Sequence, residues 1–409
     1  MSDLTALFRA AIHPLPAIHD PFFALPFDSY GQNRFVLLDD GSHGTSDGLI
    51  THHNFTMLAL EADWPDAEAL DRYVRQRPGH RGKIGKTKGD PGYEDEGEVF
   101  ERFPTWMWRN KEMQDLVEWI RDHNASLAAE KKVGIYGMDL YSLGSSMKAI
   151  ISYLDKVDPA MAKEARKRYG YCEKGVVAML RDLLERRLEY AAHPGNGEEF
   201  HSSEQNAYVV RDAERYYKAM YYSSAGSWTL RDSHMVDTLK RLTKHKPDAK
   251  VVVWAHNSHC GDARHTAMGI RRREVNIGHL CREVFGEKNV ALIGWGEDMQ
   301  VMDVKPSSRD SWERIAHDTG VESFLLDLRE DRMAREVREA LAKEHRRLQR
   351  FIGVIYRPDT ERISHYSAAD LVNQFDGYVW FDTTSAVKPL EVVQPKTALG
   401  DEETYPFGL

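Results

Sequence analysis

Short apolar runs separated by long polar stretches constrain the fold of this chain more strongly than any other feature. Each run is too short for a buried helix, and its apolar residues are continuous rather than alternating, which is typical of strands covered on both faces. Because the intervening stretches have helical spacing, the pattern predicts an α/β fold with a mainly parallel sheet flanked by helices. The predicted strands are 34–38, 55–61, 132–140, 249–256, 289–296, 350–356 and 376–382.

The region 145–245 contains no convincing strand pattern. A chain of 409 residues is long enough for one large α/β domain with insertions. We therefore predict a single domain over 1–409, with 145–245 as a helical insertion or lid within it. Helical spacing is found at 110–123, 147–155, 159–193, 204–222 and 229–243.

Composition and charge exclude several classes of protein. The net charge of -9 argues against a general nucleic-acid binder, which usually has a basic face. No apolar run approaches the roughly 18 residues of a membrane span, and the first residues lack the apolar core of a signal peptide. Three cysteines, an odd and sparse number, suit a reducing compartment. We expect a cytoplasmic protein without a nucleic-acid or membrane partner.

Carboxylates and histidines follow several predicted strands. Ligands of parallel α/β sheets usually bind outside the carboxyl ends of the strands, so these side chains are expected at one functional edge. The first, second and fourth predicted strands are followed by the candidate catalytic residues Asp40, His43, Glu61, His256 and His259.

His43 is the candidate general base. Gly41 and Gly44 on either side let the backbone turn tightly and leave room for a ligand. A histidine at this place can accept a proton at neutral pH, and Asp40 or Glu61 can orient the ring and favour its protonated form. A histidine on a surface turn fits the local sequence equally well.

His256 and His259 have the spacing of an H-x-x-H pair. Together with a carboxylate or His43 they can hold a metal, although the full H-E-x-x-H signature is absent. They can equally bind a carbonyl oxygen or a developing oxyanion, or serve as structural histidines bonded to neighbouring loops. We predict no cofactor and no metal.

Four further side chains are candidates for contact with a substrate: Trp64, Trp106, Arg231 and His365. Trp106 and Trp108 can line an apolar pocket or belong to the core at the start of a helix. Arg231 is followed by Asp232, and an Arg–Asp pair on a helix usually belongs to a solvated face.

Several stretches together resemble the erythromycin esterase family, which includes relatives labelled succinoglycan biosynthesis proteins. The resemblance covers nearly the whole chain from about residue 30, and the order of the motifs also matches. The matching stretches include GSHGTS (41–46), LEADWPDAEALDRYV (60–74), FPTWMWRNKEMQDLVEWIRDHN (103–124), SWTLRDSHMVDTL (227–239), VVVWAHNSHCGDAR (251–264) and IGVIYRPDTERISHY (352–366).

The resemblance implies a core of parallel strands with helical additions and a hydrolase that opens a carboxylic ester, in the best-known members a macrolactone. In such enzymes a histidine that matches His43 is thought to activate water directly, without a required metal. The family's acidic residues match Asp40 and Glu61, and its later histidine pair matches His256 and His259. A small-molecule ester is therefore the expected substrate.

The chain departs from the family pattern after GSHGTS. Relatives continue into a helix that contains an arginine, whereas here TSD runs directly into GLITHHNF. About 16 residues separate the first two predicted strands, so only a short crossover helix fits between them if they are a neighbouring parallel pair. The missing arginine would clamp a carboxylate or stabilise an oxyanion.

This departure leaves several interpretations open. The protein can be a compact hydrolase in which Arg231 or Arg109 supplies the cation, or a catalytically impaired relative that binds a small molecule. The sequence can also derive from a gene prediction that skips coding residues. A metal-assisted hydrolase at the same His/Glu cluster is a further alternative.

Overall fold

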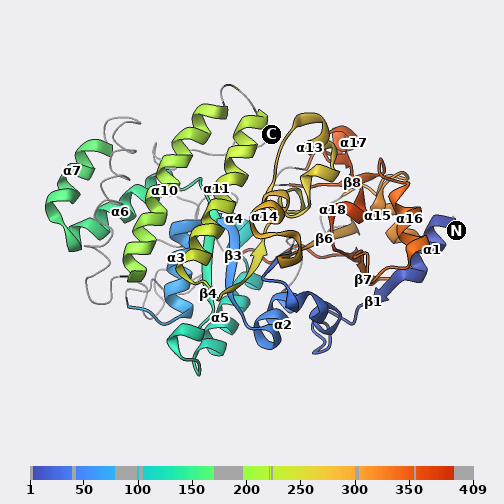
Figure 1. Ribbon diagram of the computed structural model, residues 1–409, viewed down its shortest axis with the longest axis horizontal. Helices are drawn as coiled ribbons and strands as arrows, with labels where there is room; N and C mark the ends of the chain where they lie inside the picture. The colour runs from blue at the N-terminus through green and yellow to red at the C-terminus, as the bar shows by residue number, and fades with distance from the viewer. Residues whose placement is uncertain are drawn as a thin grey trace.

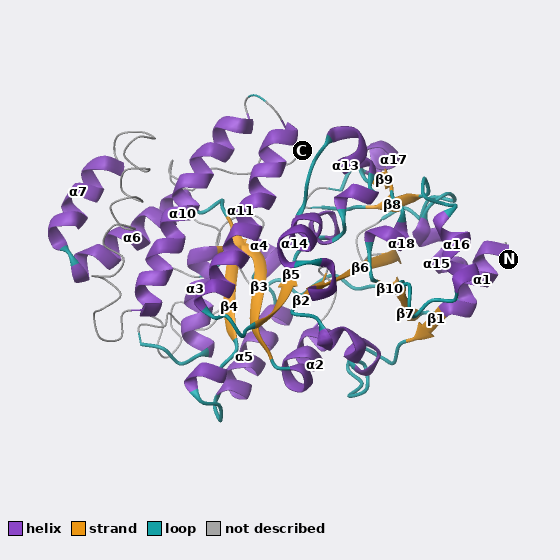
Figure 2. Cartoon of the chain, in the orientation of Figure 1, coloured by secondary structure: helices purple, strands orange, loops and turns teal. Residues whose placement is uncertain are grey.

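A large sheet with helices on both faces forms the centre of the molecule (Figures 1 and 2). The computed structural model describes residues 3–38, 43–78, 99–100, 105–169, 197–220, 222, 224–299, 304–353 and 356–390. The sheet has eight strands in the order β1-β7-β10-β6-β2-β5-β3-β4. Their bounds are β1 Ile12–Pro14, β2 Phe35–Leu38, β3 Phe55–Asp63, β4 Gly134–Asp139, β5 Lys250–Trp254, β6 Val290–Met299, β7 Ser323–Asp327 and β10 Gly377–Thr383.

The six strands from β10 to β4 are parallel to their neighbours, whereas β7 is antiparallel to both β10 and β1. The predicted α/β fold with a mainly parallel sheet is therefore confirmed. All four residues of β2 are buried, because helices cover both of its faces, and this explains why the strand shows no alternation of apolar and polar residues.

Two apolar cores lie on opposite faces of the sheet. One contains Phe35, Leu37 and Val253 and is covered by α1, α11, α14, α15 and α16. The other contains Val36, Leu38 and Val252 and is covered by η1, α2, α3 and α5. The bounds of these helices are α1 Asp3–Ala11, η1 Leu25–Gln32, α2 His43–His53, α3 Trp64–Val74, α5 Lys111–Asn124, α11 Ser224–His245, α14 Ile277–Phe285, α15 Trp312–Asp318 and α16 Arg335–Ala342.

The strands β2 and β3 are consecutive in the sequence but are not neighbours, because β5 lies between them. The expectation of a neighbouring pair is therefore wrong. The crossover between them contains α2, which contributes Leu49 and Ile50 to the core. It packs so closely on η1 that a Cβ at Gly48 would lie 2.4 Å from Ala24 Cβ. Asn54 then ends the crossover in the left-handed conformation, with φ of 58°, which asparagine tolerates better than most residues.

One predicted strand is not part of the central sheet. Of the described residues between 350 and 356, only Arg350 is in a strand, β8 (Leu348–Arg350), which pairs with β9 (Tyr366–Ala368) in a separate two-stranded sheet. Residues 351–353 have no regular structure, because this segment passes over the carboxyl edge of the sheet, where Ile352 O faces His256. In contrast, β1 and β7 belong to the central sheet although neither is among the predicted strands.

The described residues between 143 and 245 form helices and no strand: α6 Leu143–Val157, α7 Pro159–Tyr169, α10 Gly197–Met220 and α11. Helices α6, α7 and α10 share a small core of their own that includes Leu154, Phe200 and Val210. They lie beyond the β4 edge of the sheet, at the opposite end of the molecule from β1 (Figure 1). Within the described residues, every helix is too short or too polar to span a lipid bilayer.

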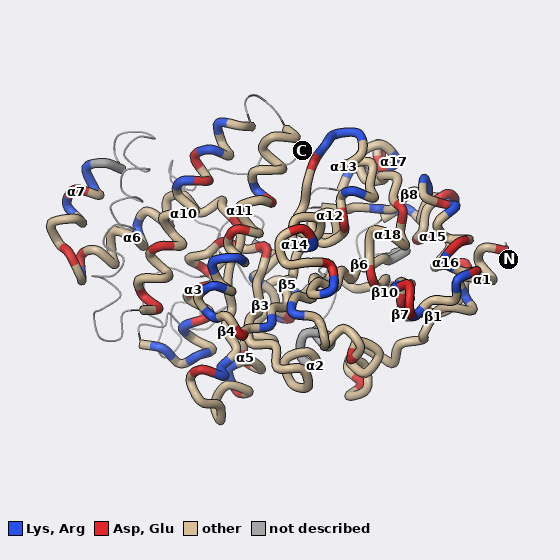
Figure 3. The backbone as a smooth tube through the Cα atoms, in the orientation of Figure 1, with Lys and Arg blue, Asp and Glu red and all other residues tan. Residues whose placement is uncertain are grey.

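Shorter helices connect the remaining segments. They are α4 Thr105–Trp108, α12 Asn257–Cys260, α13 Ala267–Arg272, α17 Glu361–Ser364 and α18 Leu371–Gln374. Basic and acidic side chains are interspersed along the described backbone (Figure 3).

Candidate functional site

A cluster of charged side chains lies buried at the carboxyl ends of β3, β4 and β5. Arg231 of α11 is at its centre. Its Nε and Nη2 atoms donate to Asp139 Oδ1 and Oδ2 at 3.0 and 2.7 Å, and Nη2 also donates to Glu61 Oε1 at 2.6 Å. His259 and Asp232 complete the group, which we call the carboxyl-edge cluster: Glu61, Asp139, Arg231, Asp232 and His259.

His259 lies in α12, directly after β5. Its Nδ1 is 2.8 Å from Asp232 Oδ2 and its Nε2 is 3.3 Å from Glu61 Oε1. Burial alone would favour the neutral ring, but the two carboxylates raise the pKa of His259 to about 10. Its ring also stacks on Trp228, with centroids 4.6 Å apart and planes 4° apart. His259 is therefore held rigidly, as an imidazolium at neutral pH.

Glu61 lies in the buried stretch of β3, two residues before the strand ends, and both of its carboxylate oxygens are engaged. Oε1 faces Arg231 and His259, while Oε2 accepts a hydrogen bond from the backbone N–H of His256 at 2.9 Å. Burial opposes ionisation, yet His259 and Arg231 hold the pKa of Glu61 well below its usual range. Glu61 is consequently an ionised carboxylate that fixes its neighbours and is poorly suited to accept a proton.

The carboxyl-edge cluster carries a net negative charge. Burial raises the pKa of Asp232, and the pKa of His259 is raised as well. At neutral pH the two side chains therefore share one proton, which an ionised carboxylate beside a neutral imidazole would lack. The pair is then neutral overall, which leaves the carboxylates of Glu61 and Asp139 against the single guanidinium of Arg231. The remaining formal charge of about -1 favours a further cation nearby.

His256 joins the end of β5 to the segment that passes over it. Its Nδ1 lies 2.7 Å from Ser258 Oγ and accepts from the backbone N–H of the same residue, so Nε2 carries the proton and donates it to Ile352 O at 3.0 Å. Burial lowers the pKa of His256. The ring is therefore neutral, and both of its nitrogens are occupied.

His43 is the first residue of α2 and follows the end of β2 by five positions. Its side chain and the whole of Asp40 lie outside the described residues. The end of β2 touches the segment that carries the two histidines, since Leu38 O accepts from Ala255 N at 3.1 Å and from Cys260 Sγ at 3.4 Å. The chain therefore leaves the sheet toward His43 beside the carboxyl-edge cluster.

The other three candidate substrate contacts have different surroundings. Trp64 is buried, and its Nε1 donates to Ser202 Oγ of α10 at 3.2 Å. Trp106 is 42% exposed on α4. His365 accepts from Arg357 N at 2.9 Å and directs Nδ1 toward Phe351 O at 3.3 Å, so both of its ring nitrogens face backbone groups. The structure thus brings together Glu61, Arg231, His256 and His259.

A comparison with known families identifies the chain. The sequence model of the family described as erythromycin esterase matches residues 50–384. This chain belongs to the erythromycin esterase family. The resemblance seen in the sequence motifs is confirmed, and family membership supports a hydrolase.

Solved structures show the same fold. A succinoglycan biosynthesis protein is 18% identical, with a TM-score of 0.69 over 94% of this chain and 98% of that one. A protein from Bacillus cereus is 19% identical, with a TM-score of 0.70 over 95% and 98%. A mutant of erythromycin esterase EreC in its open conformation is 15% identical, with a TM-score of 0.56 over 92% and 96%.

Within this erythromycin esterase fold, Arg231 and Asp232 differ from the solvated face that is usual for an Arg–Asp pair on a helix. Asp232 is completely buried and Arg231 nearly so. A signal was available, because Asp232 lies on the same helical stripe as the buried residues Met235 and Leu239. The role of Trp228 as a stacking partner of His259 had no such signal.

Arg109, the other cation proposed to replace the family arginine, is buried between α4 and α5 and donates to Val99 O at 3.4 Å. In the part of the chain that the structure describes, no group of three histidine, cysteine or acidic side chains is arranged to hold a metal ion. The side chain of His43 is outside that part.

Proposed function

We propose that this member of the erythromycin esterase family hydrolyses a carboxylic ester with water activated by His43. The carboxyl-edge cluster is the observation that supports the proposal most directly. It places a buried, net negative group of charges beside the point where the chain leaves β2 toward His43. Such a field stabilises the imidazolium that a general-base histidine becomes during the reaction.

The proposed reaction begins when His43 accepts a proton from water. The resulting hydroxide attacks the carbonyl carbon of the ester and forms a tetrahedral oxyanion. The carbon–oxygen bond to the alcohol then breaks, and the leaving alkoxide receives the proton from His43. The products are a carboxylic acid and an alcohol, and His43 returns to its neutral form without a covalent intermediate.

In this mechanism, Arg231 takes the place of the arginine that is missing after GSHGTS. Two carboxylates occupy its Nε and Nη2 atoms, but among the described residues Nη1 approaches only His259, at 3.0 Å. Nη1 carries two N–H groups, of which at most one is directed at His259 Nε2. The other is therefore suited to stabilise the oxyanion.

A panel of simple aryl esters and a macrolide tests the proposal, with release of acid measured for the wild-type chain, His43→Ala and His52→Ala. His52 is an exposed histidine of the same helix and provides the matched control. We expect His43→Ala to lower kcat/KM on every accepted ester by about 100-fold or more, while His52→Ala retains activity. Hydrolysis by His43→Ala at the wild-type rate would refute the assignment. A folded wild-type chain that cleaves no ester would instead favour the small-molecule-binding relative.

A further inference from the structure

A cavity lies directly beside the carboxyl-edge cluster, on the side of Trp228. Its lining includes Trp228, Ser258, Glu274, Phe351 and Gln374. Two of these residues connect it to the candidate site, because Trp228 stacks on His259 and Ser258 contacts His256. We call this space the Trp228 cavity. A group bound there would adjoin the region where the proposed chemistry takes place.

Three buried polar atoms that belong to the lining have no hydrogen-bond partner among the described residues. They are Trp228 Nε1, Glu274 Oε2 and Gln374 Oε1. Glu274 is 6% exposed and Gln374 is 1% exposed. A buried polar atom without a partner costs free energy, so three in one cavity indicate a site that a ligand or water completes.

Neighbouring polar side chains of the same cavity are satisfied, which sets these three atoms apart. Asn257 donates to and accepts from the backbone of Trp295. Asn276 accepts from two backbone N–H groups and donates to Ser258 O at 2.9 Å. The side-chain amides of Asn257 and Asn276 are therefore satisfied by the local fold. Among the described lining residues, one buried donor and two buried acceptors remain without a partner.

The mixture of donor and acceptors selects the chemistry of the ligand. An ammonium group satisfies Glu274 and Gln374 but has no acceptor for Trp228 Nε1–H, and a carboxylate or phosphate satisfies only the indole. Burial raises the pKa of Glu274, although the nearby guanidinium of Arg272 acts in the opposite direction. A hydroxyl group both accepts and donates, and the indole and Phe351 offer flat apolar surfaces beside it.

We propose that the Trp228 cavity binds hydroxyl groups of the substrate, so that the protein acts on a polyhydroxylated, sugar-like ester. This inference rests on the proposed ester hydrolysis for its place in the reaction. In the complex, a substrate hydroxyl accepts from Trp228 Nε1 and donates to Glu274 Oε2 or Gln374 Oε1. The ester carbonyl then lies toward Arg231.

Two acetate esters test this specificity: a monoacetylated methyl glucoside and cyclohexyl acetate. We expect the ratio of their kcat/KM values to favour the sugar ester in the wild-type chain. That ratio should fall about fivefold in Trp228→Phe, which removes the N–H and keeps an aromatic ring, and in Glu274→Met, since a hydrogen bond contributes about 1 kcal/mol. Glu330→Met, at an exposed acidic position, is the control and should keep the wild-type ratio. An unchanged ratio in both cavity variants would overturn the proposal.

Binding of unacetylated methyl glucoside separates failure of this inference from failure of the esterase proposal. The glucoside should raise the melting temperature of the wild-type chain and not that of Trp228→Phe or Glu274→Met. If this pattern holds while no ester is cleaved, the hydroxyl site stands and the esterase proposal fails. If esters are cleaved but the glucoside does not bind and the sugar ester is not preferred over cyclohexyl acetate, the cavity holds water only and the inference is wrong.

Discussion

His259 shows at the scale of a single residue how neighbours determine the state of a buried group. Its position after a strand was visible in the sequence, but its charge depends on Asp232, which follows Arg231 on a distant helix. Glu61 and Asp232 both face the ring, and they outweigh the effect of burial on its pKa. Burial lowers the pKa of His256, three residues earlier, and leaves its ring neutral although Glu61 acts in the opposite direction. Two histidines of one motif therefore have different protonation states.

The raised pKa of His259 predicts a specific dependence of stability on pH. Its folded pKa of about 10 lies above the ordinary value of about 6.5, so the protonated ring stabilises the folded state fully below pH 6.5. This contribution decreases as the pH rises from 6.5 toward 10. We expect His259→Gln to be less stable than the wild type by a few kcal/mol at pH 6, and the difference to shrink by pH 9. Urea unfolding of both proteins at several pH values measures it.

A difference between wild type and His259→Gln that stays constant from pH 6 to pH 9 would contradict this interpretation of the site. The exposed His52→Ala variant provides the reference for histidine replacement as such. Its stability should follow that of the wild type across the same range, because an exposed side chain has few interactions to lose.

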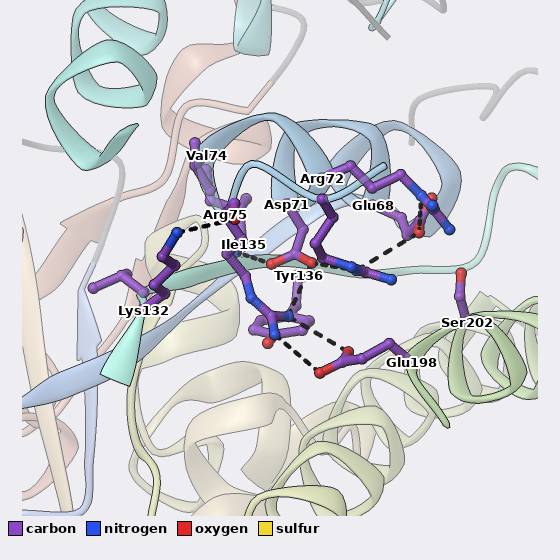
Figure 4. Close-up of polar contacts among 12 residues, drawn as sticks. Glu68, Asp71, Arg72, Val74, Arg75, Lys132, Ile135, Tyr136, Glu198 and Ser202 are labelled. Atoms are coloured by element: carbon purple, nitrogen blue, oxygen red, sulfur yellow. Dashed lines mark hydrogen bonds and ion pairs between the residues drawn. The ribbon is translucent and has the colours of Figure 1, made fainter. Parts of the chain in front are cut away.

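At the scale of elements, an ion-pair network fastens helix α10 to helix α3 (Figure 4). Arg75, the residue directly after α3, lies between Asp71 of that helix, at 3.2 Å, and Glu198 of α10, at 3.0 Å. Arg77 connects the same two helices through Asp71 and Glu199, at 2.7 and 3.1 Å. We call these contacts the α3–α10 clasp. They attach the first turn of α10 to the body of the protein beside β4.

Removal of the central cation should loosen this attachment. We expect Arg75→Ala to destabilise the protein by about 2–3 kcal/mol, between the roughly 1 kcal/mol of a surface pair and the roughly 3–5 kcal/mol of a buried one. The control is Arg335→Ala, which breaks an exposed pair with Glu339 on α16 and should cost almost nothing. Equal losses for the two variants in chemical denaturation would show that the clasp is only a surface feature.

Acid should weaken the α3–α10 clasp as well. Although burial acts in the opposite direction, contacts with His245 and Arg75 hold the pKa of Glu198 well below its usual range. A carboxyl with a depressed pKa stabilises the folded state above its unfolded pKa of about 4.3, and the contribution is lost as the pH falls below that value. The stability cost of Arg75→Ala should therefore be smaller at low pH than at pH 7.

At the scale of the whole molecule, the helical region and the sheet share one apolar core. Met235, Val236, Leu239 and Leu242 of α11 pack in the same cluster as strand residues such as Leu37 and Val253. The region that we propose as an insertion, 145–245, contributes buried side chains to the central core. It is therefore poorly suited to unfold by itself. We propose that residues 1–409 behave as one cooperative domain.

Calorimetry of the full chain should therefore show a single unfolding transition. Leu239→Ala removes a completely buried side chain of α11 and should lower the stability by about 2–5 kcal/mol, with the whole transition moving to lower temperature. Lys240→Ala, at the next and exposed position, should leave the transition almost unmoved. Two separate transitions, of which only one responds to Leu239→Ala, would show that the helical region is an independent domain.

The sequence by itself determined the positions of most strands of the central sheet and the polar residues at its carboxyl edge. A strand buried on both faces needs a continuous apolar run, which is visible without knowledge of its neighbours. The segments 34–38, 55–61, 132–140, 249–256, 289–296 and 376–382 accordingly contain strands of the sheet. Glu61, His256 and His259 were also visible as polar residues at strand ends, and they do meet in space.

Only the tertiary structure decided which strands are neighbours, which helix face enters the site, and which apolar segment leaves the sheet. β5 separates β2 from β3, Arg231 and Asp232 reach the cluster from α11, and residues 351–353 pass over the edge of the sheet. Each of these outcomes depends on packing between segments that are far apart in the chain. Periodicity along the sequence records how each segment is buried but not against which partner, and that choice arises only when the whole core is assembled.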